Sequence, residues 1–190
     1  MAYVLFISEE RLKDATTIGL NVDTSLLSPY IKMSQKLFIE TKLGSNLTDK
    51  LKALIVAGTV NDAGNEAYAT LLNDYIAEVL PSFCLHMAIP FLRFKIEGGN
   101  IYSKTSETGT ALTTEEAQHL RNEVLNTAEY YMERMIDYIS HNKTSFPEYS
   151  TNTGSDVRPD TNSFYSNMNL ERPNQQDNRY TLRNTIGNLN

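Results

Sequence analysis

Apolar residues recur at intervals of three and four through most of the first 142 residues, the spacing that aligns them on one face of an α-helix. Glycine or proline follows several of these periodic segments, at Gly44, Gly58 and Pro81, and marks where a helix is expected to end. The Thr-x-x-Glu sequence at Thr113–Glu116 predicts a capping box ahead of the last segment. The predicted helices cover residues 9–15, 24–43, 47–57, 62–80, 83–96 and 114–141.

Two short segments lack helical periodicity. Tyr3–Ile7 is an apolar run of β-forming residues and predicts a strand or an arm. So short a strand cannot stand alone, so we expect it to pair with a later strand or to add to the edge of another chain, through Tyr3, Leu5 and Ile7. Residues 100–111 follow two glycines and are rich in Thr and Ser, which suits a β-hairpin or a projecting loop.

The last predicted helix is the longest. With a rise of 1.5 Å per residue it would extend for about 40 Å, which is more than a body of this size needs to fold on itself. We therefore expect part of its apolar stripe to face another subunit. The predicted fold class is mainly α: a helical bundle with one long C-terminal helix, a short N-terminal strand and a small β-hairpin or loop, followed by an extended C-terminal tail.

The composition changes beyond Asn142. Residues 143–190 are rich in Asn, Ser and Thr and contain only seven Leu, Ile, Val or Phe, too few to bury a core unaided. We therefore divide the chain into a helical domain of residues 1–142 and an extended polar tail of residues 143–190, which partner subunits order and which the domain does not need for folding. The tail would bind through isolated anchors: Phe164, Tyr165, Met168, Leu170, Tyr180, Leu182 and Ile186.

The net charge of −6 lies in the predicted domain, because the tail carries equal numbers of acidic and basic residues. An acidic body argues against tight binding to phosphate backbones. The N-terminus has no basic region and its apolar run is too short for a signal peptide, so we expect synthesis to end in the cytoplasm. Residues 83–96 are likewise too short to cross a membrane. A single cysteine, Cys84, excludes an internal disulfide.

Candidate chemistry is sparse. Glu116 and His119 have the Glu-x-x-His spacing of di-metal helical bundles, but a second such pair is missing, and Glu116 is better explained as the capping-box carboxylate. A stripe of acidic residues every four positions on the last helix is explained by a solvated or subunit-facing surface. Cys84 and His86 are two residues apart on a predicted helix and so point away from each other. We predict no enzyme activity, no cofactor and no metal site.

The order of elements resembles that of the helical head-to-tail connector, or adaptor, proteins of tailed bacteriophages, which form rings beneath the portal. The likeness covers residues 9–149. Over this range the pattern of elements looks closest to that of the neck ring proteins of crAss-like phages. It is carried by the first helix around Leu26–Ile31 ending at Leu43-Gly44, the helix of residues 47–57, the apolar helix of residues 83–94, the loop of residues 100–111, and the long helix closing at Phe146–Tyr149.

The resemblance implies a homo-oligomeric ring, commonly of about twelve copies, in the neck of the virion. It implies contact with the portal protein and with other neck or tail ring proteins, and a lumen through which DNA passes during packaging and ejection without specific binding. A different interpretation of the same residues is a cellular helical interaction module whose tail binds another partner.

Overall fold

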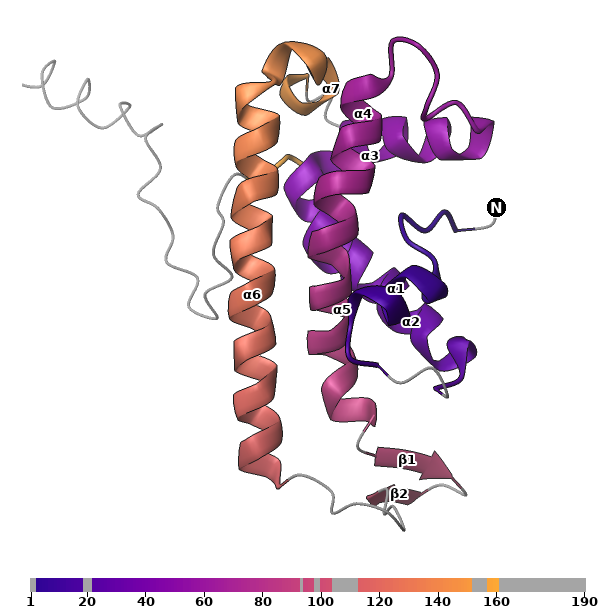
Figure 1. Ribbon diagram of the computed structural model, residues 1–190, viewed down its shortest axis with the longest axis vertical. Helices are drawn as coiled ribbons and strands as arrows, with labels where there is room; N and C mark the ends of the chain where they lie inside the picture. The colour runs from indigo at the N-terminus through magenta and orange to yellow at the C-terminus, as the bar shows by residue number, and fades with distance from the viewer. Residues whose placement is uncertain are drawn as a thin grey trace, which may run out of the picture.

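The computed structural model describes residues 3–18, 22–92, 94–97, 100–103, 113–151 and 157–160, and the protein is mainly α-helical (Figure 1). The first half contains α1 (Glu9–Ala15), α2 (Thr24–Ser34), the π-helical segment η1 (Gln35–Ile39) and α3 (Glu40–Ala57). The second half contains α4 (Glu66–Thr70), the π-helical segment η2 (Leu71–Ile76), α5 (Ala77–Leu92), β1 (Phe94–Glu97), β2 (Asn100–Ser103), α6 (Thr114–His141), η3 (Lys143–Ser145) and α7 (Pro147–Ser150).

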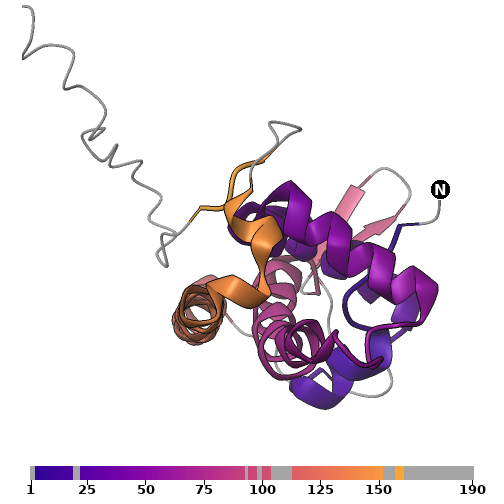
Figure 2. The same ribbon diagram turned by 90° about the horizontal axis from the view of Figure 1, so that it is seen from above.

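Helix α5 forms the centre of the body. The long helix α6 lies along one side of it, and α1 and α2 lie on the other side (Figures 1 and 2). Side chains from all of these elements meet in one hydrophobic core, in which Phe38 stacks on Phe83 with ring centroids 4.2 Å apart. Burying a large apolar side chain stabilises a fold by roughly 1.5–3 kcal/mol, so the contacts of α5 hold the two sides together.

Side chains cap several helix N-termini. The Ser8 hydroxyl accepts from the backbone N–H of Arg11, and the Asp23 carboxylate accepts from that of Ser25, so both cap their helices. Thr113 and Glu116 form the predicted capping box, with the Thr113 N–H donating to Glu116 Oε2 over 2.8 Å. Each cap satisfies backbone groups that the first turn of a helix leaves without partners.

The prediction that one helix ends at Gly44 and another begins after it is confirmed. Gly44 has φ +76° and ψ 165°, a conformation that residues with a side chain rarely adopt. Because this conformation is not helical, α3 consists of two helical segments that meet at a kink at Gly44. Gly58, with φ +69°, ends α3 as predicted.

Pro81 does not break a helix, which corrects the sequence prediction. Residues 66–92 form one continuous helical stretch that passes through Pro81 and Pro90. A proline inside a helix costs about 3 kcal/mol, but burial of Val79, Leu80 and Phe83 outweighs that cost. The stretch then ends at Leu92, earlier than predicted, and β1 pairs with β2 in an antiparallel register of Phe94 with Ser103.

The continuous stretch Glu66–Leu92 is also long and apolar enough to cross a membrane by length and composition, the one such case in the described part of the chain. Half of its apolar window is buried within the protein, and the core helices of soluble proteins meet the same criterion. Its contacts with α6, α2 and α1 explain its apolar character as that of a core helix.

The N-terminal segment forms an arm and not a strand within the described chain. Residues 3–8 have no strand partner there and pack against η1, while pairing with the edge of another chain stays a prediction. The reason is Gln35, whose side-chain amide supplies the hydrogen bonds that a neighbouring strand would otherwise provide.

The packed body extends beyond Asn142, the predicted end of the domain. Phe146 is fully buried beside Tyr68 and Tyr138, and Tyr149 of α7 is also buried. Residues 157–160 pack on α3. The packed body therefore continues to at least Asp160, and the tail begins later than the composition indicated.

Candidate interaction surfaces

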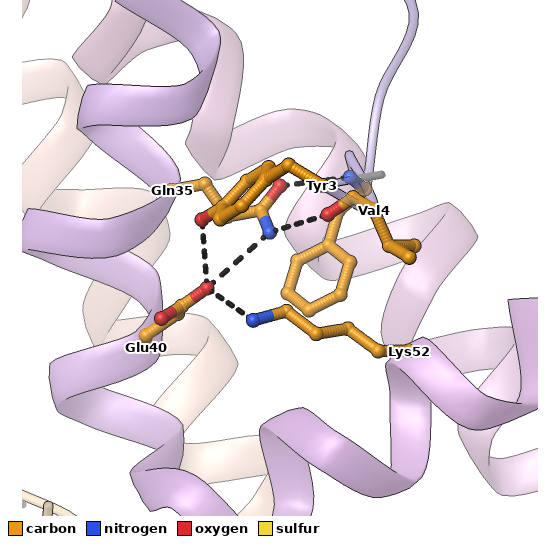
Figure 3. A network of polar contacts seen from close by, with 6 residues as sticks. Tyr3, Val4, Gln35, Glu40 and Lys52 are labelled. Carbon is orange, nitrogen blue, oxygen red and sulfur yellow. Dashed lines mark hydrogen bonds and ion pairs between the residues drawn. The ribbon is translucent and has the colours of Figure 1, made fainter. Parts of the chain in front are cut away.

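A buried glutamine organises the N-terminal part of the molecule (Figure 3). Gln35 is fully buried, and its Oε1 accepts from the Phe6 N–H over 2.8 Å while its Nε2 donates to the Val4 carbonyl over 3.0 Å. A residue in a parallel β-strand makes the same two bonds, to the carbonyl of one residue and to the N–H two positions later. The amide therefore replaces a strand, and it leaves only the opposite edge of the segment open for strand addition.

Glu40 is the centre of the adjoining polar network (Figure 3). Its Oε1 accepts from the Tyr3 hydroxyl at 2.9 Å, from Gln35 Nε2 at 3.5 Å and from Lys52 Nζ at 2.7 Å. Burial and the nearby Glu40 carboxylate both raise the pKa of Tyr3, so this hydroxyl stays protonated and donates. The ammonium groups of Lys32 and Lys52 lie 4.9 and 5.2 Å from the centroid of the Tyr3 ring.

Tyr3 thus forms one wall of an apolar groove of about 980 Å³, which we call the N-terminal groove. Val56 lies in its lining with 74% of its surface exposed, an unusual setting for a β-branched apolar side chain. Lys32 and Lys52 line its edge. The remaining lining residues are Val4, Ala53 and Ala57. Two of the three predicted strand-addition residues, Leu5 and Ile7, are instead packed in the core of the chain itself.

A second apolar surface, the α6 face, lies on a different element of the molecule. It presents Leu120 and Tyr130, the latter 61% exposed, on the long helix. We expected part of the apolar stripe of α6 to face another subunit. Within that stripe Ala128 and Met135 are buried against the body, whereas Leu120 is 44% exposed. What α6 offers to a partner is therefore a narrow set of apolar side chains and not its whole length.

A third apolar surface, the α2 stripe, consists of Leu26, Tyr30, Met33 and Leu37, with Phe91 of α5 beside it. The first four recur at intervals of four, three and four and so follow one line along α2 and η1. Leu26, Met33, Leu37 and Phe91 are each exposed over 40–51% of their surface. The Tyr30 and Phe91 rings lie 5.5 Å apart, which joins the two helices into one surface.

The beginning of the predicted tail is bound to α3. The Ser45 N–H donates to the Val157 carbonyl over 3.0 Å, and the Asp160 N–H donates to the Thr41 carbonyl over 3.0 Å. Asp160 also forms an ion pair with Lys42, whose side chain is only 1% exposed, at 2.8 Å. This segment crosses the kink at Gly44, and a Cβ there would lie 2.7 Å from the Pro159 ring. The glycine therefore makes room for the segment.

The candidate catalytic and metal-binding residues do not converge. Burial raises the pKa of the Cys84 thiol to about 12, so it is a weak nucleophile at neutral pH. His86 is buried, and its Nδ1 bonds the Arg121 carbonyl over 3.1 Å. Glu116 is engaged in the capping box and His119 is exposed. Within the described residues, groups of three or more His, Cys, Asp or Glu that could hold a metal ion are not found.

The predicted tail anchors lie outside the described residues, and their contacts stay predictions. They are Phe164, Tyr165, Met168, Leu170, Tyr180, Leu182 and Ile186.

The sequence analysis missed the structural roles of Gln35 and Lys42, although their positions in the apolar pattern indicated that both are buried. Gln35 and Lys42 fall at core positions of the apolar pattern, four residues after Ile31 and three after Ile39. A polar residue at an inward position needs a buried partner, and here the partners are the N-terminal segment and Asp160. The identity of those partners could not be read from spacing.

The fold and these surfaces define a mainly α-helical protein whose distinctive parts are apolar surfaces and docked terminal segments. A family model described as "Family of unknown function (DUF6712)" matches residues 39–159. The match covers more than half of the chain, which therefore belongs to this family. It ends within the segment docked on α3. No curated protein and no solved structure gives a significant match.

Proposed function

We propose that the chain is a structural subunit of a head-to-tail connector in a tailed phage, assembled as a homo-oligomeric ring in the neck of the virion. The proposal is supported by the resemblance of residues 9–149 to such connectors and by the arrangement of the apolar surfaces. In this role the ring contacts the portal protein and other neck or tail rings. The protein is made in the host cytoplasm and has no enzyme activity.

The observation that carries the proposal is that the N-terminal groove and the α6 face are two different apolar surfaces, formed by different elements. Helix α6 and the N-terminal segment lie on opposite sides of α5 (Figures 1 and 2). A two-fold dimer uses one self-complementary surface twice, whereas a ring needs two different surfaces that bind each other head to tail. Exposed apolar side chains such as Val56 and Tyr130 are the kind that a subunit contact removes from water.

The charge of the chain fits a ring around DNA. With a net charge of −6, the subunit lacks the excess of basic residues that grips a phosphate backbone. During packaging and ejection, DNA slides more easily past a surface that repels it than past one that binds it. The lumen in this proposal therefore guides DNA without recognising its sequence.

The remaining tail ties neighbouring subunits or rings together. Residues 171–190 carry the anchors Tyr180, Leu182 and Ile186 separated by polar residues, a pattern suited to lying along a partner. These anchors are far enough from Asp160 to reach another subunit.

The test uses two substitutions that introduce a charge at exposed apolar positions, Val56→Glu in the groove and Tyr130→Glu on the α6 face. Native mass spectrometry and class averages from electron microscopy of the full-length protein are expected to show cyclic oligomers. Each variant alone should stay monomeric. A mixture of the two should form 1:1 dimers and no rings, because each variant still offers the one surface that the other lacks. Asn73→Glu, at an exposed polar position of η2, is the matched control and should assemble normally.

A monomer at high concentration, with or without portal and neck proteins, would refute the proposal. Symmetric dimers that both variants abolish, with no dimer in the mixture, would refute the head-to-tail contact.

A further inference from the structure

The segment docked on α3 points toward the α2 stripe. Val157 bonds Ser45 and Asp160 bonds Thr41, so the segment runs along α3 toward the N-terminal end of that helix. Leu37 and Met33 precede Thr41 by four and eight residues in the continuous helical run of η1 and α2. The Thr41 hydroxyl donates to the Leu37 carbonyl over 2.8 Å, so Leu37 lies one turn further along this line. A chain that continues past Asp160 in the same direction runs onto the α2 stripe.

We propose that residues 161–170 of the same chain bind the α2 stripe, with Phe164 over Leu37 and Met33 and with Met168 and Leu170 over Tyr30 and Leu26, since these three anchors share one face of an extended chain. The inference does not depend on ring assembly, because the occupant belongs to the subunit itself.

The reach of the segment agrees with the length of the stripe. Leu37 and Met33 lie at most about 6 and 12 Å from Thr41 along the helix axis, and Tyr30 and Leu26 at most about 16 and 22 Å. An extended chain spans about 13 Å from Asp160 to Phe164, and about 26–33 Å to Met168 and Leu170. The segment is thus long enough to reach the whole stripe, and its anchors follow the same order as the exposed apolar side chains.

The composition of the segment also matches. Residues 161–170, Thr-Asn-Ser-Phe-Tyr-Ser-Asn-Met-Asn-Leu, carry no charged side chain, whereas residues 171–190 carry five. An uncharged segment can cover an apolar stripe without desolvating a charge. The anchor at Asp160 holds it nearby at an effective concentration in the millimolar range, so even weak contacts suffice for binding.

The test measures how fast chymotrypsin cleaves the full-length protein after Phe164, Tyr165, Met168 and Leu170, followed by intact mass spectrometry. Leu37→Glu and Met33→Glu change exposed side chains and should leave the helices intact by circular dichroism. Each should increase the cleavage rate about tenfold or more, the factor that corresponds to a loss of 1.4 kcal/mol of contact free energy. Leu120→Glu, on the α6 face with a similar exposure of 44%, is the matched control and should cleave at the rate of the original protein.

A second measurement separates binding within the chain from binding between chains. Protection of residues 161–170 should be the same in dilute monomer and in concentrated samples, since the segment is tethered to its own stripe. Equal cleavage rates in the original protein and both stripe variants would overturn the proposal, as would protection that appears only when oligomers form. Loss of rings without loss of protection would refute the proposed function and leave this inference standing.

Discussion

The ion pair between Lys42 and Asp160 allows the sharpest test of how the tail is attached. Replacing Asp160 by Asn removes the carboxylate that faces the buried ammonium at 2.8 Å while keeping the shape of the side chain. Lys42 is 1% exposed and Asp160 is 50% exposed, so the pair is neither fully buried nor on the open surface. Breaking a buried pair by removing one partner costs about 3–5 kcal/mol, and exposed pairs contribute about 0–1 kcal/mol.

We therefore expect Asp160→Asn to lower the free energy of unfolding by about 2 kcal/mol, an intermediate value set by water at the carboxylate. The corresponding fall in melting temperature is about 4–8 °C for a chain of this length. Urea unfolding followed by circular dichroism measures the first quantity and thermal unfolding the second. Asp137→Asn, on the exposed side of α6, is the matched control and should change stability by less than about 0.5 kcal/mol.

The two members of the pair should respond unequally. Lys42→Met keeps the apolar stem in the core and leaves a carboxylate that water can solvate, so it should cost less than Asp160→Asn. In the Lys42→Met background Asp160→Asn should become nearly neutral. An unchanged cost of Asp160→Asn in that background, or a cost below about 0.5 kcal/mol in the original protein, would refute the reasoning.

The remaining predictions concern the same body. Ending the chain after Asp160 should cost about 1.4 kcal/mol, the contact free energy proposed for residues 161–170, as measured by urea unfolding. Ending it after Thr151 should cost about 2 kcal/mol or more beyond that, because the second cut also removes Asp160 from a buried ammonium. Gly44→Ala should lower the free energy of unfolding by at least about 2 kcal/mol and Gly58→Ala by about 1 kcal/mol. Both glycines have positive φ, but only Gly44 faces Pro159. Equal losses in the two variants would contradict the close packing at Gly44. Gln35→Leu should lower the free energy of unfolding by about 2 kcal/mol and speed hydrogen exchange of the N-terminal segment, because it leaves two backbone groups without their buried partner. Unchanged exchange rates would show that the Gln35 amide does not hold the segment. Burial lowers the pKa of His86 in the folded protein, so as the pH falls the imidazole takes up a proton in the unfolded chain first, and stability should fall below about pH 6.5. His86→Gln should reduce this loss of stability. An identical dependence of stability on pH in the variant would contradict this role of His86.

Much of the helical structure follows from local rules that the sequence states directly. The caps at Ser8, Asp23 and Thr113 and the terminating Gly58 depend on hydrogen bonds and backbone preferences within a few residues of each other. The spacing of apolar residues likewise located the helices, because one face of each must leave water. The mainly α class therefore needed no tertiary information.

The tertiary structure decided whether helices continue, and where the packed body ends. Proline disfavours a helix locally, but burial in the core around α5 stabilises the fold by more than Pro81 destabilises the helix. One continuous helix therefore forms where two were predicted. The polar composition after Asn142 indicated a free tail, but Phe146 fills the core. The residue that binds the following segment, Lys42, is distant in sequence.

The candidate surfaces show the same division. Spacing placed Leu26, Met33 and Leu37 on one line of a helix, but only packing decides which side of that helix the core covers and which side stays in water. Gln35 shows the converse, because its pattern position is inward and its hydrogen-bonding partners come from residues about 30 positions away. Local conformational preferences depend on neighbouring residues. The partners of buried polar groups depend on long-range contacts, which the spacing of residues along the sequence does not reveal.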